Sequence, residues 1–123
     1  MKNILVVDDE KEVLEVTKKI LIKNQYAVLT ASGGKEAVAI AKANHPDLIL
    51  LDIVMPDMDG RDVLVELKKD AGTKNIPIIF VTARGEQFER DYGLELGAHE
   101  YISKPCDANF LLSQVAGILA KSK

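Results

Sequence analysis

The sequence predicts an α/β fold in which one parallel sheet is covered by helices on both faces. Short apolar stretches alternate with longer stretches whose apolar residues recur at helical spacing, which is the order typical of βαβ units. The apolar runs ILVV, LILL and IIFV are unbroken, as in strands that are buried on both sides. Each connection is long enough for a right-handed crossover, so we expect five parallel strands alternating with five helices.

The first half of the chain contains three predicted strands and two predicted helices. Strands are expected at residues 3–7, 27–30 and 48–52. Between them, residues 11–23 place apolar side chains on one face and charged side chains on the other, which predicts an amphipathic helix. Gly33 and Gly34 interrupt the second strand, and residues 35–44 form a second helix that ends before Pro46.

The second half continues the alternation. A third helix follows Gly60 and stops at Gly72, and Pro77 then opens a strand over residues 78–82. Residues 86–96 suggest a fourth helix, and residues 101–103 a short fifth strand. Asp107 is expected to cap the last helix, whose apolar face continues to Leu119.

Composition favours one compact domain over residues 1–123 and excludes several functions. No apolar run approaches the roughly 20 residues that cross a bilayer, and the opening MKNILVV is too short for a signal peptide, so we expect a cytoplasmic protein without membrane insertion. The single cysteine, Cys106, excludes an internal disulfide and suits a reducing compartment. A net charge of −3 without a basic block argues against direct binding of nucleic acid.

Polar side chains follow the predicted strands at the points where they end. These residues are Asp8 and Asp9, Asp52, Thr82 and Lys104. If the strands are neighbours, the five side chains surround one crevice at the carboxyl edge of the sheet, where ligands of open α/β sheets bind. Three crowded carboxylates repel one another unless a cation compensates them or their pKa values rise. Oxygen ligands in small number favour Mg²⁺ over zinc, so the sequence predicts a magnesium site.

This set of residues suits chemistry at phosphorus. An aspartate beside Mg²⁺ and a lysine can act as a nucleophile and form an acyl phosphate. The metal and Lys104 would neutralise charge on the phosphoryl oxygens, and the hydroxyl of Thr82 would donate a hydrogen bond to one of them.

Over essentially its whole length, the chain resembles the receiver domain of two-component response regulators, of the single-domain, chemotaxis-regulator type. Five motifs carry the resemblance: VVDDE, ASGGKEA, LLDIVMPDMDG, FVTARG and LGAHEYISKP. The resemblance implies a flavodoxin-like, doubly wound sheet with strand order 2-1-3-4-5. It also implies that Asp52 accepts a phosphoryl group from a phosphohistidine on a sensor histidine kinase or a histidine phosphotransfer protein.

The resemblance further assigns a role to each site residue. Asp9, Asp52 and the backbone carbonyl of Val54 would ligate Mg²⁺, with Asp8 reaching the ion through water. Thr82 and Lys104 would hold the phosphoryl oxygens. Thr82 and Tyr101 would then act as the switch.

The expected output of that switch is a change in protein contacts. The face made by the fourth helix, fifth strand and last helix would bind a downstream protein, with the domain a monomer or an activation-dependent dimer. Phosphotransfer and autodephosphorylation would be self-catalysed, so the domain is a phosphoacceptor and not a metabolic enzyme.

Three other functions remain open at this point. An FMN-binding electron carrier would need a phosphate-binding loop after the first strand, where Asp8, Asp9 and Glu10 repel phosphate. A haloacid-dehalogenase-type phosphatase would need an acid two residues after Asp52, where Val54 stands. The third alternative is a receiver-shaped binding module that is never phosphorylated.

Overall fold

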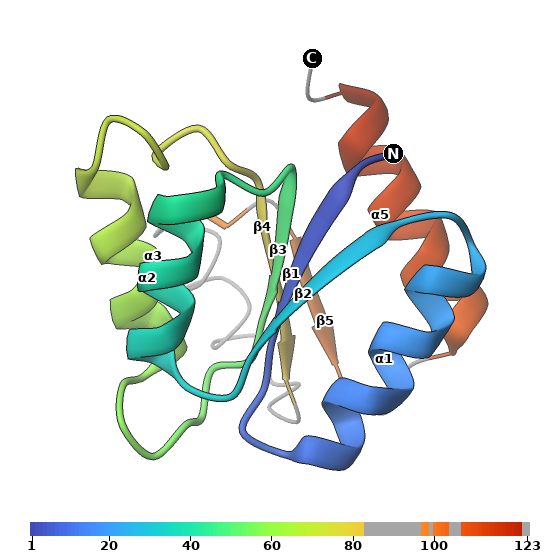
Figure 1. Cartoon of the computed structure of the whole chain (residues 1–123), viewed down its shortest axis with the longest axis horizontal. Helices are drawn as coiled ribbons and strands as arrows, with labels where there is room; N and C mark the ends of the chain where they lie inside the picture. Colours follow the sequence, from blue (N-terminus) through green and yellow to red (C-terminus); the bar gives the residue numbers. More distant parts are fainter. Residues whose placement is uncertain (83–96, 99, 104–106, 122–123) are drawn as a thin grey trace.

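The fold is a five-stranded parallel sheet with helices on both faces, as the alternation of the sequence predicts (Figure 1). A computed structural model describes residues 1–82, 97–98, 100–103 and 107–121. The strand order is β2-β1-β3-β4-β5, which confirms the flavodoxin-like order. This order makes β1, β3 and β4 the three inner strands of the sheet.

The strands are short and keep a simple register. Their bounds are β1 Asn3–Val7, β2 Ala27–Ala31, β3 Leu48–Leu51, β4 Ile78–Thr82 and β5 Glu100–Ser103. Val7 pairs with Leu51 across β1 and β3, and Leu51 pairs with Phe80 across β3 and β4. The carboxyl ends of the inner strands therefore meet at one edge of the sheet.

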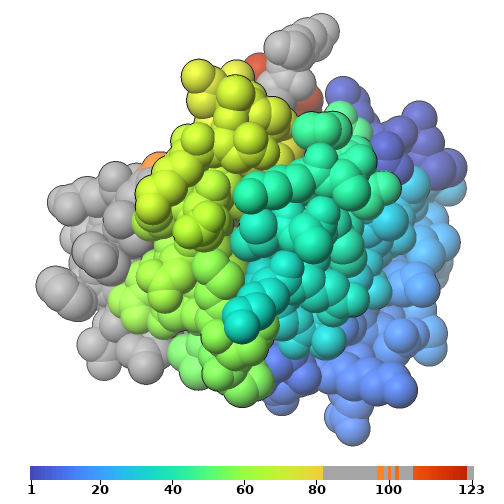
Figure 2. Space-filling model, turned by 60° about the vertical axis from the view of Figure 1, so that its left-hand side comes forward, coloured from blue at the N-terminus to red at the C-terminus, as the bar shows by residue number. Residues whose placement is uncertain are grey.

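Of the helices that the structure describes, two cover each face of the sheet. The helices in the described part of the chain are α1 Lys11–Lys23, α2 Gly34–Asn44, α3 Gly60–Lys69 and α5 Ala108–Lys121. Figure 1 shows α1 and α5 on one side of the sheet and α2 and α3 on the other. In the space-filling view of Figure 2, α2 and α3 lie side by side and form one continuous face.

The sheet separates two hydrophobic cores because successive strand residues point to opposite faces. In β1, Leu5 and Val7 pack in the core under α2 and α3, while Ile4 and Val6 pack in the core under α1 and α5. Both sides of the inner strands are therefore buried, which explains their unbroken apolar sequence.

β1, α1 and β4 have the predicted bounds, whereas some other elements end a few residues away from the expected positions. β3 ends at Leu51, so Asp52 is the first residue after the strand, and α2 begins one residue early at Gly34. The third helix was expected to reach Gly72 but ends at Lys69. The carbonyl oxygen of Leu67, in the last turn, accepts from the hydroxyl of buried Thr73 at 2.7 Å and from the backbone N–H of Asp70 at 3.4 Å.

Three further expectations concern the helices: the cap of the last helix, the fourth helix and the ability to span a membrane. Asp107 caps α5 as predicted, because its Oδ2 accepts a hydrogen bond from the backbone N–H of Phe110 at 3.3 Å. The helix expected at residues 86–96 lies outside the described residues. Among the helices that the structure describes, none has the length and apolar character needed to cross a membrane.

Candidate functional site

Three carboxylates converge at the carboxyl edge of the sheet. Oxygen atoms of Asp8, Asp9 and Asp52 all lie within 4.8 Å of one another. Asp8 and Asp52 are buried, with 3% and 6% of their surface exposed, whereas Asp9 is exposed. The cluster predicted from the strand ends is thus present and open to solvent on one side.

Backbone pairing at the ends of β1 and β3 places the two buried acids. The backbone N–H of Asp52 donates to the carbonyl oxygen of Val7 at 3.0 Å. The backbone N–H of Asp8 donates to Ala31 at the end of β2, at 3.1 Å. Both acids are therefore held by the hydrogen-bond ladder of the sheet, one residue beyond their strands.

Short hydrogen bonds also orient the two side chains. Oδ1 of Asp8 accepts from the backbone N–H of Glu10 at 2.9 Å, and Oδ1 of Asp52 accepts from the backbone N–H of Ile53 at 2.8 Å. These bonds hold Oδ1 of each acid next to its own backbone at the edge of the sheet.

The charge of this cluster suits a small divalent cation. Three ionised carboxylates this close together repel one another, and a bound cation offsets that repulsion. The site offers oxygen donors, few in number and open on one side, which is the donor set typical of Mg²⁺. The residues present therefore fit the magnesium ion that the sequence predicts.

The loop between β3 and α3 begins at Asp52 and returns to contact its backbone at Gly60. Gly60 donates its backbone N–H to the carbonyl oxygen of Ile53 at 2.7 Å, and a Cβ added at Gly60 would overlap the carbonyl oxygen of Asp52. Asp59 caps α3 by accepting from the backbone N–H of Arg61 at 2.8 Å. Between these anchors, Val54 is 51% exposed.

Asp57 in the same loop has a role that the sequence interpretation missed. Its carboxylate accepts hydrogen bonds from the backbone N–H groups of Gly34 and Lys35, at 3.0 and 3.1 Å. These bonds lower the pKa of Asp57 below its ordinary value, the bond from Gly34 contributing most. Asp57 thus caps α2 from a different part of the chain, a contact that no local sequence signal reveals.

For the other predicted site residues, Thr82 and Tyr101, the structure describes only the backbone. Thr82 ends β4, at the same edge of the sheet as Asp52, and Tyr101 lies in β5 opposite Phe80. The side chains of Thr82 and Tyr101, and all of Lys104, lie outside the described residues.

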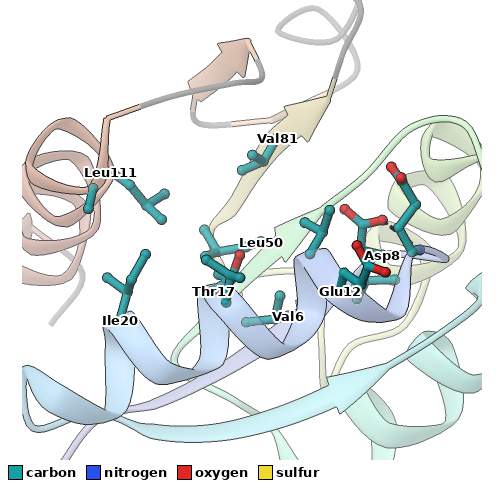
Figure 3. A pocket seen from close by; sticks show the side chains of 13 residues that line it. Val6, Asp8, Glu12, Thr17, Ile20, Leu50, Val81 and Leu111 are labelled. Atoms are coloured by element: carbon teal, nitrogen blue, oxygen red, sulfur yellow. Dashed lines mark hydrogen bonds between the residues drawn. The ribbon is translucent and has the colours of Figure 1, made fainter.

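An apolar groove of about 520 Å³ leads to the acidic cluster (Figure 3). Ile20 of α1 and Leu111 of α5 lie toward one end of the groove, whereas Asp8 and Glu12 lie toward the other. Its apolar lining includes Val6, Val13, Leu50 and Val81. The groove therefore joins an apolar surface between two helices to the edge of the carboxylate site.

Comparison with known proteins decides the family. A sequence model of the response regulator receiver domain matches residues 4–116. The chain belongs to this family. Receiver domains of this family are signalling switches of two-component systems and generally bind Mg²⁺ at an acidic pocket, which corresponds here to the cluster of Asp8, Asp9 and Asp52.

The curated relatives of this receiver domain are of two lengths. Protein PilH of Pseudomonas aeruginosa is 38% identical over 120 residues, which cover 98% of this chain and 99% of PilH. The alkaline phosphatase synthesis transcriptional regulatory protein PhoP of Bacillus subtilis is 39% identical over 122 residues, which cover 99% of this chain and 50% of PhoP. The chain spans about half the length of the transcriptional regulators that it matches.

Solved receiver domains have the same fold over the whole chain. The receiver domain of the Francisella response regulator 1452 has a TM-score of 0.93 at 29% identity and covers all of both chains. A CheY-like receiver domain protein from Methanospirillum hungatei has a TM-score of 0.92 at 32% identity and covers 99% of this chain and 96% of its own.

Proposed function

We propose that this receiver domain is switched by phosphorylation of Asp52. The observation that carries the proposal is the position of Asp52, a buried carboxylate at the end of an inner strand, within 4.8 Å of two further carboxylates. In the transfer, a carboxylate oxygen of Asp52 bonds to phosphorus as the bond from phosphorus to the donor's histidine nitrogen breaks. The product is an acyl phosphate, and the donor imidazole recovers a proton from solvent.

The chain's own residues would prepare this step. Asp9, Asp52 and the carbonyl of Val54 would hold Mg²⁺, with Asp8 bound to the ion through water. When bound, the metal supplies positive charge that offsets the charge on the phosphoryl oxygens. The hydrogen bond from the N–H of Ile53 orients the carboxylate of Asp52 at the edge of the sheet.

The switch itself would involve the neighbouring strand ends. Thr82 and Lys104 would bind the phosphoryl oxygens, and the movement of Thr82 would let Tyr101 rotate. The face that includes β5 and α5 would change, and the population would shift toward the conformation that binds a downstream protein.

The proposed partners follow from the family of the chain and from the apolar groove beside Asp8. We propose residues 1–123 as a single receiver domain that works in the cytoplasm and receives its phosphoryl group from a sensor histidine kinase or a histidine phosphotransfer protein. The apolar groove beside Asp8 suits a donor that brings apolar side chains next to its phosphohistidine. Output would pass through protein contacts, without direct binding of nucleic acid.

The intact mass of the protein after incubation with acetyl phosphate tests the proposal. Wild type should gain one phosphoryl group in the presence of Mg²⁺, and Asp52→Asn should gain none because the amide is not a nucleophile toward phosphorus. Glu66→Gln, which changes an exposed acid on α3, is the control and should label like wild type. Normal labelling of Asp52→Asn, or no labelling of wild type at any Mg²⁺ concentration, would refute the assignment, and the second result would favour the silent binding module.

A further inference from the structure

The contact between Asp57 and the beginning of α2 joins two parts of the chain that are far apart in sequence. Asp57 belongs to the loop that starts at Asp52, while Gly34 and Lys35 lie 23 and 22 residues earlier. Both carboxylate oxygens are used, Oδ1 by the N–H of Gly34 and Oδ2 by the N–H of Lys35. The loop is thereby attached to a helix that contributes no residue to the carboxylate cluster.

The sequence around α2 is adapted to this contact. The residue before the helix, Gly33, has no side chain to cap the free N–H groups of the first turn, so the carboxylate of Asp57 takes that role. A Cβ at Gly33 would lie 2.9 Å from Oδ1 of Asp57, and a Cβ at Gly34 would lie 2.6 Å from Cβ of Met58. A side chain at position 33 would displace the carboxylate of Asp57, and one at position 34 would press on Met58 and hold the loop away from the helix.

The same loop carries the backbone that the proposed metal site needs. Its ends are fixed at Ile53 and Gly60, and Asp59 holds it to α3. Val54, whose carbonyl is the proposed ligand, is half exposed and lies between Asp52 and Asp57. Met55, next to Val54, is buried in the core under α2 and α3, and the contact of Asp57 with α2 adds a second restraint further along the same loop.

We propose that Asp57 is a positioning residue for the metal and phosphoryl site, acting by clamping the loop between β3 and α3 to the first turn of α2. This inference rests on the proposed function for its consequence in phosphorylation, but its effect on Mg²⁺ binding can be measured separately. The clamp lowers the cost of ordering the loop when Mg²⁺ binds, because the backbone at Val54 is already restrained.

The experiment compares Mg²⁺ affinity by calorimetry in wild type, Asp57→Ala, Gly33→Ala and Asp62→Ala. Asp57→Ala should bind Mg²⁺ about fivefold more weakly, at the lower end of typical couplings between sites. Asp62→Ala removes the same charge from the first turn of α3 and should remain within about twofold of wild type, the change that loss of one exposed charge allows.

Gly33→Ala keeps every carboxylate and breaks the clamp from the other side. Position 33 has an extended backbone, with φ −161°, which alanine adopts without strain, so the added methyl group displaces the flexible Asp57 side chain and leaves the fold intact. It should weaken Mg²⁺ binding as Asp57→Ala does. Equal Mg²⁺ affinity in Gly33→Ala, Asp62→Ala and wild type would overturn the inference even if Asp57→Ala failed to fold.

Amide resonances give a second readout that a purely stabilising contact would not change. Titration with Mg²⁺ should shift the amide signals of Gly34 and Lys35 in wild type and Asp62→Ala, and leave them unchanged in Asp57→Ala. Identical shifts in Asp57→Ala and wild type would contradict the clamp. Failure of wild type to accept a phosphoryl group would refute the proposed function instead, without altering these metal comparisons.

Discussion

The backbone of Asp52 leaves no space for a side chain at position 60. A Cβ there would overlap the carbonyl oxygen of Asp52 and would also approach Cα of Ile53 at 2.8 Å. Because both contacts are with backbone, no side-chain rotation can relieve them. We expect Gly60→Ala to lose about 2 kcal/mol of unfolding free energy, measured by urea denaturation, and to weaken Mg²⁺ binding by displacing Asp52.

Gly117 provides the matched control for this substitution. It lies inside α5, and a Cβ added there would meet nothing within 4 Å. Gly117→Ala should therefore stabilise the protein by about 0.5–1 kcal/mol through helix propensity alone, with unchanged Mg²⁺ affinity. Equal stability of the two alanine variants would contradict the steric account of Gly60.

Single residues were predictable from sequence where the signal was local. Asp8, Asp9 and Asp52 could be placed together because each follows an apolar strand, and parallel strands end at the same edge. The contact of Asp57 with α2 could not be predicted, since nothing within the loop indicates a helix that begins 23 residues earlier. The glycines at 33 and 34 were the only available signal, and they were interpreted as strand breakers.

At the scale of elements, the attachment of α2 to Asp57 should make stability depend on acidity. The hydrogen bonds from Gly34 and Lys35 lower the pKa of Asp57 in the folded protein below its ordinary value of 3.8. The stabilisation is therefore complete above pH 3.8 and is lost as the pH falls through the lower, folded-state pKa. The difference in unfolding free energy between wild type and Asp57→Asn should be constant near neutrality and shrink in acid. A difference that grew in acid would contradict this assignment.

The helices and strands that the structure describes were predicted in type and order, and the ends of β1, α1 and β4 were predicted as well, but other ends were not. The third helix was expected to reach Gly72 because the apolar spacing and the glycine gave the clearest stop signal. In the structure, Thr73 folds back on the carbonyl of Leu67, so the helix ends at Lys69. Such contacts depend on side chains that return from the next segment, and local periodicity contains no information about them.

At the scale of the whole molecule, the acidic cluster should link metal binding to stability. Ionised Asp8, Asp9 and Asp52 repel one another, and a bound cation removes that repulsion. Mg²⁺ at 100 times its dissociation constant should add about 2.7 kcal/mol of stability and raise the melting temperature. Asp8→Asn should melt at a higher temperature than wild type without Mg²⁺ and should gain much less when Mg²⁺ is added, as scanning calorimetry would record. Equal gains in both proteins would exclude the cluster as the metal site.

The layered architecture was predictable because alternating apolar and amphipathic segments leave few ways to build a parallel sheet. The strand order could not be predicted from the pattern of apolar residues, because that pattern does not show whether β1 lies beside β3 or at an edge of the sheet. It followed from the family resemblance, and the register of Val7 with Leu51 confirms it. This pairing of inner strands brings acids more than 40 residues apart in the sequence into contact distance.

The hydrogen bond from the backbone N–H of Asp52 to Val7 should also protect this amide from hydrogen exchange. Its amide belongs to the ladder between two inner strands, so it should exchange with deuterium only when the whole domain unfolds. Asp9 lies two residues beyond β1 in an exposed bend, where we expect exchange to need only small fluctuations. The carboxylate that we propose as the phosphoryl acceptor thus follows an inner strand of the sheet, whereas we expect its exposed neighbour Asp9 to open locally and admit ligands from solvent.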